Sequence, residues 1–272
     1  MKVWFITGAS KGFGRIWAEA ALRRGDHVAA SARRKETLES LRSQFGNRVL
    51  TLEVDVQNRE AVFAAVKQAK EHFGRLDVVV NNAGYGQFGA IEELSEAEIR
   101  AQFETNVFGA LWVTQAALPY LREQKSGHIL QVSSIGGVHA FPNIGIYHAS
   151  KWALEGLSQS LAQEVKPLGV HVTLIEPVGY ATDWAGPSAQ FARPNPAYEH
   201  VREAMKARRQ AGKPGVPEAT AEPILTLVDM AQPPLRLFLG ATANAMIHAE
   251  YEKRLAEWDQ YNELSVKAHG LG

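Results

Sequence analysis

The 272-residue chain has no cysteine, and its charges balance, with 29 Lys and Arg residues against 29 Asp and Glu residues. The lack of cysteine excludes disulfides, thiolate catalysis and zinc–thiolate sites, and it is compatible with a reducing cytoplasm. The charge balance gives no overall field toward nucleic acid or an anionic membrane. No apolar run approaches the ~18 residues of a membrane span. We therefore expect a cytoplasmic protein that binds a small molecule, without nucleic acid or membrane partners.

Short apolar segments alternate with longer amphipathic ones, which is typical of a parallel sheet covered by helices on both faces. We expect one α/β domain over residues 1–272, with a Rossmann fold and a doubly wound, seven-stranded parallel sheet. The predicted strands are 3–7, 27–32, 49–54, 78–81, 127–133, 170–176 and 235–239. The predicted helices are 13–24, 35–45, 58–73, 95–123, 145–167 and 217–231.

Two segments depart from this alternation. Residues about 184–215 form a long insertion that contains Gly, Pro and the helical stretch EHVREAMKARR. We interpret it as a substrate lid; the alternative is a surface excursion that covers a sheet edge. Residues about 242–272 form a C-terminal extension, predicted to be a solvent-facing amphipathic helix with Tyr251, Leu255 and Trp258 along one side. This helix packs either on its own domain or on another subunit.

A glycine-rich turn, TGASKGFG, joins the first strand to the first helix. Glycine permits a tight turn and close approach of the backbone to a phosphate, and the start of a helix favours negative charge. The turn therefore predicts a dinucleotide site, against the alternative of a turn without a ligand. The candidate cofactor contacts in it are Gly8, Ser10, Lys11, Gly12, Phe13 and Gly14.

The second strand ends in Arg33 and Arg34, where an NAD-binding chain would carry an acid for the ribose 2′-hydroxyl. An arginine matches the charge and geometry of a 2′-phosphate, so the sequence favours NADP(H) over NAD. Arg33, with Ser10 and Lys11, is expected to surround this phosphate. Alternatively, the two arginines are solvated loop charges.

The stretch YHASK places Tyr147 and Lys151 four residues apart, on one face of a helix. A cation at that position stabilises a phenolate, so we expect Lys151 to lower the pKa of Tyr147 from its free value of ~10. A phenol whose pKa is lowered in this way can donate a proton to a substrate. As an isolated motif, the pair would be an ordinary feature of a helix surface.

Five motifs in order resemble the short-chain dehydrogenase/reductase family, and the resemblance covers residues 1–240. They are TGASKGFG, NNAG at 81–84, FETNVFG, QVSSIGG and YHASK. The nearest likeness is to NADP-dependent members, including steroid-dehydrogenase-like and ketoreductase-like proteins. The resemblance implies that Tyr147 is the general acid and that Lys151, Ser134 and Asn106 assist it.

Ser133 competes with Ser134 for the role of the substrate-binding hydroxyl. Alternation along the strand allows at most one of them to face the substrate, and the family spacing selects Ser134. A buried, structural role for Asn106 is compatible with its expected role near Lys151.

The resemblance also implies cofactor contacts beyond the glycine turn. They are Asp55, Val56, Asn81, Ala83, Gly84, Tyr147, Lys151, Pro177, Val178 and Thr182. Asp55 has an alternative role as the cap of the following helix. Family members carry Pro-Gly where this chain has Pro177 and Val178. We hypothesise that Val178 narrows the pocket, because its methyl groups occupy space that glycine leaves open.

Mostly apolar residues around these motifs are candidate walls of the substrate pocket, which favours a hydrophobic or aromatic carbonyl compound. They are Tyr85, Phe88, His139, Phe141, Ile144, Val178, Tyr180 and Trp184. Each aromatic side chain has the alternative role of filling the core. None of the nine histidines lies in a metal-ligand pattern, so no metal is expected.

The predicted function is NADPH-dependent reduction of ketones or aldehydes, reversible as oxidation of secondary alcohols. Two alternatives are a non-catalytic NADPH-binding regulator and an enzyme like the sugar-nucleotide epimerases and dehydratases, which also use Tyr-x-x-x-Lys. Family members commonly pair through helices equivalent to 95–123 and 145–167, which implies a homodimer or homotetramer.

Overall fold

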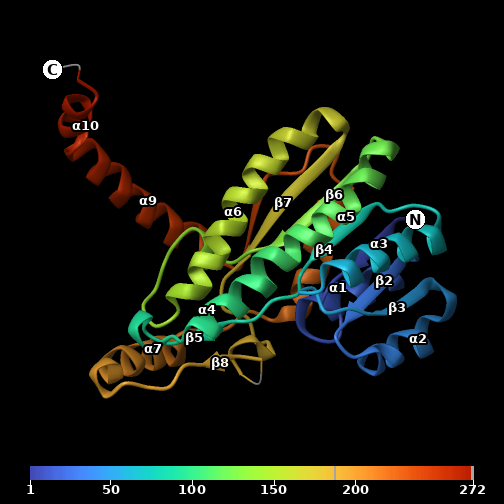
Figure 1. Ribbon diagram of the computed structural model, residues 1–272, viewed down its shortest axis with the longest axis horizontal. Helices are drawn as coiled ribbons and strands as arrows, with labels where there is room; N and C mark the ends of the chain where they lie inside the picture. Colours follow the sequence, from blue (N-terminus) through green and yellow to red (C-terminus); the bar gives the residue numbers. More distant parts are fainter. Residues whose placement is uncertain (187, 271–272) are drawn as a thin grey trace.

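The computed structural model describes residues 1–186 and 188–270, and its centre is a seven-stranded parallel sheet (Figure 1). The strand order is β3-β2-β1-β4-β6-β7-β9, and every pairing is parallel. The strands are β1 (Val3–Ile6), β2 (His27–Ala32), β3 (Val49–Glu53), β4 (Val78–Asn81), β6 (Gly127–Val132), β7 (Val170–Pro177) and β9 (Arg236–Leu239). The predicted Rossmann fold and all seven predicted strands are confirmed.

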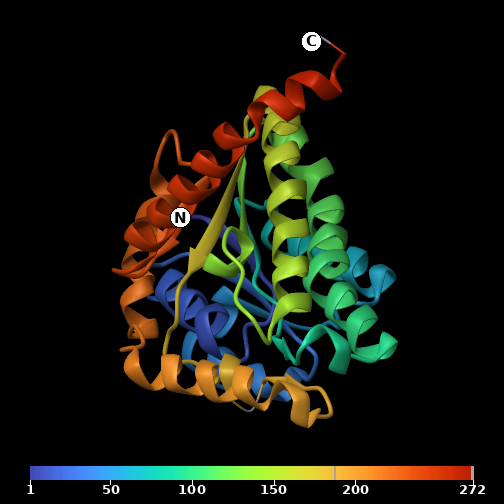
Figure 2. The ribbon, with the colours of Figure 1, turned by 90° about the vertical axis from the view of Figure 1, so that its left-hand side faces the viewer.

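Helices cover both faces of the sheet (Figures 1 and 2). One face packs against α1 (Gly12–Arg23), α2 (Glu39–Phe45) and α8 (Ala221–Asp229). The other face packs against α3 (Arg59–Phe73), α5 (Gly109–Gln124) and α6 (Gly145–Val165). In β1 all four residues are buried, because this central strand contacts helices on both sides.

The predicted long helix over 95–123 is three pieces in the structure. They are α4 (Glu96–Phe103), a π-helical segment η4 (Glu104–Phe108) and α5. Ser95 caps α4 by accepting a hydrogen bond from the Glu98 N–H. Widening of a helix into a π segment is frequent at functional sites, and this one carries Asn106. The spacing of apolar residues did not reveal the π-helical segment, since the apolar pattern continues through it.

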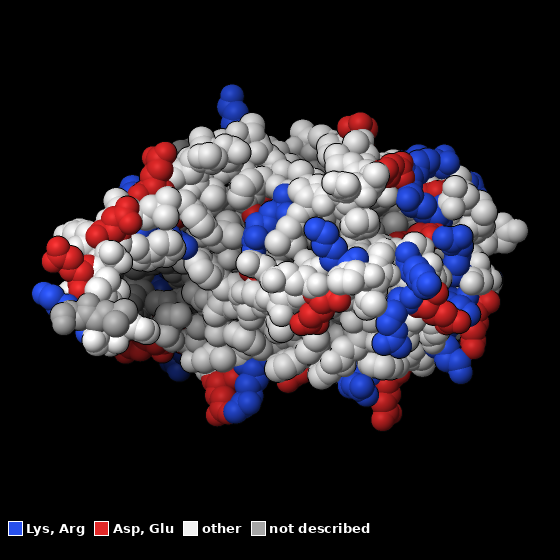
Figure 3. All heavy atoms as spheres, turned by 90° about the horizontal axis from the view of Figure 1, so that it is seen from above, with Lys and Arg blue, Asp and Glu red and all other residues white. Residues whose placement is uncertain are grey.

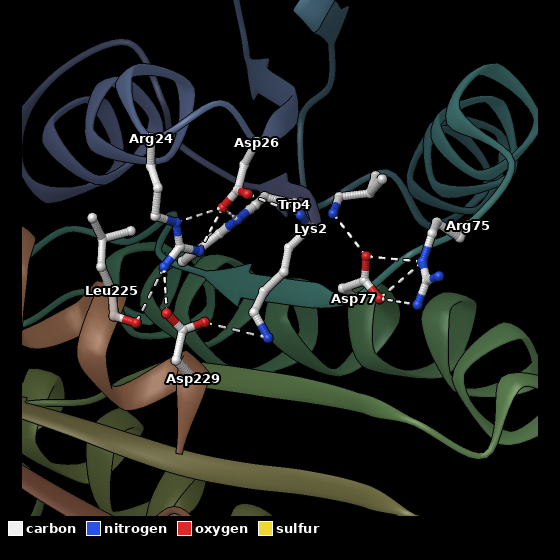
Figure 4. A network of polar contacts seen from close by, with 9 residues as sticks. Lys2, Trp4, Arg24, Asp26, Arg75, Asp77, Leu225 and Asp229 are labelled. Atoms are coloured by element: carbon white, nitrogen blue, oxygen red, sulfur yellow. Dashed lines mark hydrogen bonds and ion pairs between the residues drawn. The ribbon is translucent and has the colours of Figure 1, made fainter. Parts of the chain in front are cut away.

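A polar network holds the amino ends of the central strands, at the edge opposite to the candidate active site (Figure 4). Asp26 accepts hydrogen bonds from the Lys2 N–H, Trp4 Nε1 and Arg24 Nε. Burial favours the protonated form of this carboxyl, but these donors outweigh burial and lower its pKa. Arg24 also reaches Asp229 at 2.8 Å, so the network ties the strand ends to α8.

The insertion after β7 crosses beneath the carboxyl ends of the strands and contains α7 (Glu199–Ala211), as the EHVREAMKARR stretch predicted. Residue 187, within the predicted lid, lies outside the described residues. Two short strands, β5 (Gln87–Phe88) and β8 (Gln190–Phe191), pair in parallel and join the insertion to the loop after β4. Glu93 also accepts hydrogen bonds from the Asn195 N–H and from Arg202, within the insertion and α7.

The predicted C-terminal helix is present as α9 (Ala243–Gln260) and α10 (Asn262–Ala268), which project away from the body of the molecule in Figures 1 and 2. Residues 271–272 lie outside the described residues. The beginning of α9 packs through Ala243 and Ile247. Tyr251, Leu255 and Trp258 are exposed, so the predicted apolar side of this helix faces solvent in the single chain.

Charges of both signs alternate over the surface seen in Figure 3, in agreement with the neutral composition. In residues 1–186 and 188–270, no helix is both long enough and apolar enough to cross a bilayer.

Candidate active site

The glycine turn lies at the carboxyl end of β1, next to the loop that follows β4. Gly8 and Gly12 have positive φ angles of 65° and 58°, which glycine adopts without strain. A Cβ on Gly8 would lie 3.0 Å from the Cα of Ala83, and a Cβ on Gly14 would lie 2.6 Å from the Gly8 carbonyl oxygen. Side chains at these two positions would therefore fill the cradle that the turn forms.

Asn82 holds the glycine turn in place, although the sequence analysis did not single it out. Its Nδ2 donates hydrogen bonds to the carbonyl oxygens of Thr7 at 2.9 Å and Gly8 at 3.1 Å. Thr7 Oγ1 accepts from the N–H groups of Asn82 and Ala83, both at 3.0 Å. The asparagine pair in NNAG was the available signal, since neighbouring residues at a strand end point to opposite sides.

Asn81, which was predicted to contact the cofactor, points into the protein instead. Its side chain donates to Thr114 Oγ1 and Gln131 Oε1, both at 3.0 Å. Asn81 is 4% exposed. The structure gives this side chain a role in joining β4 to β6 and α5.

The start of α1 suits a phosphate group. No side chain caps it, and its first turn contains no acid, so its first N–H groups remain available to an anion. Lys11 is the N-cap residue, and its Nζ lies 3.5 Å from Asp183 of the insertion. The glycine turn and the free N–H groups at the start of α1 fit a phosphorylated dinucleotide.

Arg33 and Arg34 follow β2 and are both exposed. The charge of Arg33 acts on the Tyr85 hydroxyl: burial raises the pKa of Tyr85, and Arg33 partly opposes this. Arg33 therefore extends toward the loop after β4. Arg34 precedes a short 3₁₀ helix, and its carbonyl oxygen accepts from Thr37.

Asp55 and Val56 follow β3. Asp55 Oδ1 accepts from the Gln57 N–H at 3.1 Å, while Asn58 is the residue that caps α3. The alternative role of Asp55 as the helix cap is therefore wrong. Val56 is buried against Gly109 at the start of α5.

Tyr147 is at the start of α6 and is 5% exposed, and its hydroxyl lies near that of Ser134. Ser134 comes directly after β6, and its Oγ accepts from the Gly136 N–H at 3.0 Å. Ser133 is buried and faces Glu155 instead. The two serines thus point to different sides, as their alternation predicted.

Lys151 lies one turn after Tyr147, with its Nζ 5.7 Å from the centre of the Tyr147 ring. Its Nζ donates to the Val132 carbonyl oxygen at 2.8 Å. Burial lowers the pKa of Lys151 to about 8, and the carboxylate of Glu155 opposes that shift.

The pKa of Tyr147 differs from the sequence-based expectation. Burial raises it to about 12, and the neighbouring Ser134 hydroxyl only partly offsets this. The expected net lowering of the Tyr147 pKa is therefore wrong. Loss of water around the phenol outweighs the lysine, whose ammonium group is directed at a backbone carbonyl oxygen.

Asn106, in the π segment η4, connects the loop after β4 to α6. Its Oδ1 accepts from the Tyr85 N–H at 3.2 Å, and its Nδ2 donates to the Tyr85 carbonyl oxygen and to Ser150 Oγ, both at 3.1 Å. A Cβ on Gly84 would lie 3.0 Å from Asn106 Oδ1 and 3.7 Å from Lys151 Nζ. Glycine at position 84 therefore keeps the space beside Asn106 and Lys151 open.

Several predicted pocket residues surround Tyr147. They are Phe88, Phe141, Ile144 and Trp184. The Trp184 ring centre lies 4.9 Å from that of Tyr147 and 5.6 Å from that of Phe88. A Cβ on Gly86 would come within 2.6 Å of Trp184, so the indole can occupy this place only because residue 86 has no side chain. The insertion thus brings an aromatic side chain onto the tyrosine.

Other predicted pocket residues lie elsewhere. Tyr180 packs edge-on against Phe13, 5.2 Å between ring centres. His139 contacts Glu250 of α9 through its Nδ1 at 3.2 Å and meets the Phe141 ring edge to face. Of the predicted cofactor contacts after β7, Thr182 caps the short helix that carries Trp184, and Pro177 ends β7 beside Leu239.

Val178, which was hypothesised to narrow the pocket, has a side chain that packs toward β9. Its side chain packs in an apolar cluster with Ile135 and Val138. A Cβ on Gly240 would come within 2.2 Å of Val178 Cγ2, so the methyl groups point toward the end of β9. Within the described residues 1–186 and 188–270, Val178 is not among the non-glycine residues with positive φ. It therefore adopts its conformation without backbone strain.

The model of the short chain dehydrogenase family matches residues 2–192. The chain belongs to this family. Oxidoreductase BOA17 of Botryotinia fuckeliana is 42% identical over 269 residues, which cover 97% of this chain and 98% of that protein. The short-chain dehydrogenase family membership predicted from the five motifs is thus confirmed, and the protein is an NAD(P)-dependent oxidoreductase.

Solved structures agree with this assignment to the short-chain dehydrogenases. A short-chain dehydrogenase from Streptomyces avermitilis superposes with a TM-score of 0.93 at 39% identity, covering 98% of this chain and all of that one. An alcohol dehydrogenase from the archaeon Thermococcus sibiricus, complexed with 5-hydroxy-NADP, superposes with a TM-score of 0.74 at 31% identity, covering 88% and 96% of the two chains.

Proposed function

We propose that this short-chain dehydrogenase reduces hydrophobic or aromatic ketones and aldehydes with NADPH, and oxidises the corresponding secondary alcohols in reverse. The observation that carries the proposal is that the hydroxyls of Tyr147 and Ser134 are neighbours, one helical turn from Lys151 and beside Trp184. Two neighbouring hydroxyls can both donate to one carbonyl oxygen placed between them.

The dinucleotide, when bound, supplies the hydride that the carbonyl carbon accepts. Tyr147 gives its proton to the carbonyl oxygen, and Ser134 donates a hydrogen bond to the same oxygen. The raised pKa of Tyr147, about 12, keeps the phenol protonated before reaction. Lys151, as an ammonium ion, stabilises the phenolate that remains after the proton has left. Asn106 positions the Tyr85 backbone and Ser150 around this group.

NADP(H) is the proposed cofactor because Arg33 and Lys11 bring positive charge to the glycine turn, while β2 ends without an acid. The proposed contacts in the turn are Gly8, Ser10, Lys11, Gly12, Phe13 and Gly14. Arg33, Arg34, Asp55, Val56, Ala83, Gly84, Pro177 and Thr182 remain proposed contacts around it.

We propose one catalytic domain in which residues 184–215 act as the substrate lid and residues 242–272 as a C-terminal extension. The β5–β8 pairing and the Glu93–Arg202 contact support the lid, since both fasten the insertion beside Tyr147. The proposed location is cytoplasmic, and the proposed assembly is a homodimer or homotetramer. Exposed Phe108, Trp152 and Leu157 on η4 and α6 support pairing through these helices.

Turnover of a panel of ketones and aldehydes, followed by the absorbance of NADPH, tests the proposal. Tyr147→Phe should lower kcat/KM by about 10²- to 10⁴-fold and leave NADPH binding unchanged, because the phenol acts on the substrate oxygen. Tyr120→Phe, on α5, is the matched control. Binding of NADPH without turnover of any carbonyl compound would favour a regulator, and turnover of a nucleotide sugar without net NADPH consumption would favour an epimerase.

A further inference from the structure

Two buried carboxyl groups lie behind the Tyr147–Lys151 pair. Glu155 is on α6, one turn beyond Lys151, and is 5% exposed. Glu176 is near the end of β7 and is 0% exposed. Buried acids are rare unless they are paired. The reaction proposed above uses neither of them, so their place beside the site needs a physical reason.

The two carboxyl groups lie close together, and both face Arg236 of β9. A proton on one of them relieves the repulsion between them, because two ionised carboxylates side by side repel strongly in a buried environment. Burial, followed by the charge of Glu155, raises the pKa of Glu176 to about 9, which assigns the proton to Glu176. Between the two titrations, the pair therefore carries one negative charge.

Burial raises the pKa of Glu155 as well, and neighbours on β9 and after β6 oppose this shift and favour its charged form. Arg236 Nε lies 3.0 Å from Glu155 Oε2 and 3.4 Å from Glu176 Oε1. The Arg236 Nη2 is held by Gln159 of α6 at 2.9 Å. The Ser133 hydroxyl, after β6, lies beside Glu155 next to Gly137 and favours ionised Glu155. Neighbours from two other elements thus favour the charged form of Glu155.

The charge of Glu155 acts on Lys151. From one helical turn away, it opposes the effect of burial on the pKa of this lysine. Tyr147 and His148 are the other titratable side chains of α6 at this level, and burial favours the neutral form of both. The protonation of the Lys151 side chain therefore depends on the charge of Glu155.

We infer that Glu155 is a positioning residue that keeps Lys151 in its ammonium form, and that Glu176 and Arg236 serve to hold a single negative charge on Glu155. This inference builds on the proposed function, in which the Lys151 ammonium stabilises the Tyr147 phenolate. It gives the acid pair, the arginine and the lysine one electrostatic role along α6, β7 and β9.

Glu155→Gln and Glu176→Gln form a matched pair of variants that tests this inference. Each replaces one carboxyl of the pair by an amide of equal size, so their structural costs are matched. Glu155→Gln removes the charge next to Lys151, and the alkaline limb of the pH profile of kcat/KM should move about one pH unit lower. Glu176→Gln leaves Glu155 ionised, since the amide can still donate to it, and the limb should stay in place. Glu164→Gln, exposed on α6, is the neutral control.

Equal shifts of the alkaline limb in both variants, or no shift in Glu155→Gln, would overturn the inference. Glu155→Asp keeps a carboxylate on α6 and should restore the wild-type limb at least in part. A purely structural role would lower kcat at every pH and would not move the limb.

A measurement without cofactor or substrate separates this inference from the proposed function. NMR titration of ¹³C-labelled lysine, with Lys151→Met for assignment, should show Lys151 charged at pH 7 and its midpoint lowered in Glu155→Gln. In the wild-type protein, ¹³C-labelled glutamate should show one protonated and one ionised carboxyl in the pair at pH 7. Two ionised or two protonated carboxyls would contradict the inference even if the Glu155→Gln variant failed to fold. Absence of carbonyl turnover alongside the expected titrations would overturn the proposed function alone.

Discussion

The indole of Trp184 lies against the phenol of Tyr147, with 4.9 Å between ring centres and 56° between ring planes. Trp184 belongs to the insertion after β7, whereas Tyr147 is in α6. The insertion therefore supplies an apolar surface next to the proposed proton donor. A planar apolar group beside a carbonyl can stack on such a surface, which is the basis of the first prediction.

Trp184→Ala should raise KM for aromatic ketones about tenfold and change KM for a small aliphatic ketone much less, because only the aromatic substrate loses a stacking partner. Steady-state kinetics with both substrates checks this. Trp152→Ala is the control, since Trp152 lies on the outer side of α6 and stacks with Arg254. An equal increase in KM for both substrates would show that Trp184 positions Tyr147 and does not select the substrate.

Arg33→Ala should raise KM for NADPH by about 10- to 100-fold and leave KM for NADH nearly unchanged, because it removes a partner of the 2′-phosphate. Arg34→Ala should have a smaller effect, since the charge of Arg33 reaches Tyr85 beside the site while Arg34 leads into a 3₁₀ helix. Comparison of the four KM values checks both statements. Equal increases in KM for NADPH and for NADH would contradict a contact between Arg33 and the 2′-phosphate.

Val178→Gly should lower the free energy of unfolding by about 1–3 kcal/mol, because it removes methyl groups from an apolar cluster and adds backbone freedom. Urea unfolding measures this change. The ratio of product stereoisomers should stay the same, as the side chain faces Gly240. A changed stereochemical ratio with unchanged stability would instead restore the interpretation of Val178 as a pocket wall.

His128 should make the protein less stable in acid. It is 5% exposed and donates to Thr173 Oγ1 at 2.9 Å, and burial, aided by the charge of His171, lowers its pKa to about 3. The unfolded chain, with an ordinary histidine pKa of ~6.5, binds more protons between these values. Stability is therefore lost as pH falls from about 6.5 toward 3, by up to about 1.4 kcal/mol per pH unit from this residue.

His128→Gln should flatten that dependence, because glutamine keeps a donor for Thr173 and does not titrate. Urea unfolding at pH 4, 5, 6 and 7 gives the slope for each protein. His200→Gln, exposed on α7, should keep the wild-type slope. If the His128→Gln slope matched that of the wild type, the acid sensitivity would have to be assigned to other groups.

Local sequence patterns were sufficient for the fold and for the motif residues. Apolar runs of four to eight residues located all seven strands, because a strand buried on both faces must be apolar throughout. Tyr147 and Lys151 could be paired from their spacing, since residues four apart share a helix face. Gly8 and Gly12 could be recognised because positive φ is a property of the residue type itself.

Contacts between distant segments could not be read in this way. The burial of Tyr147, which raises its pKa where the sequence predicted a lowering, depends on Trp184 and Phe88 from other parts of the chain. The direction of Val178, the inward turn of Asn81 and the meeting of Glu155 with Glu176 depend on packing against other strands and helices. The sequence determined which chemical groups are present and in what local order. The tertiary structure decided their solvation and their partners, because electrostatic energies depend on distance and on exclusion of water, which no local pattern specifies.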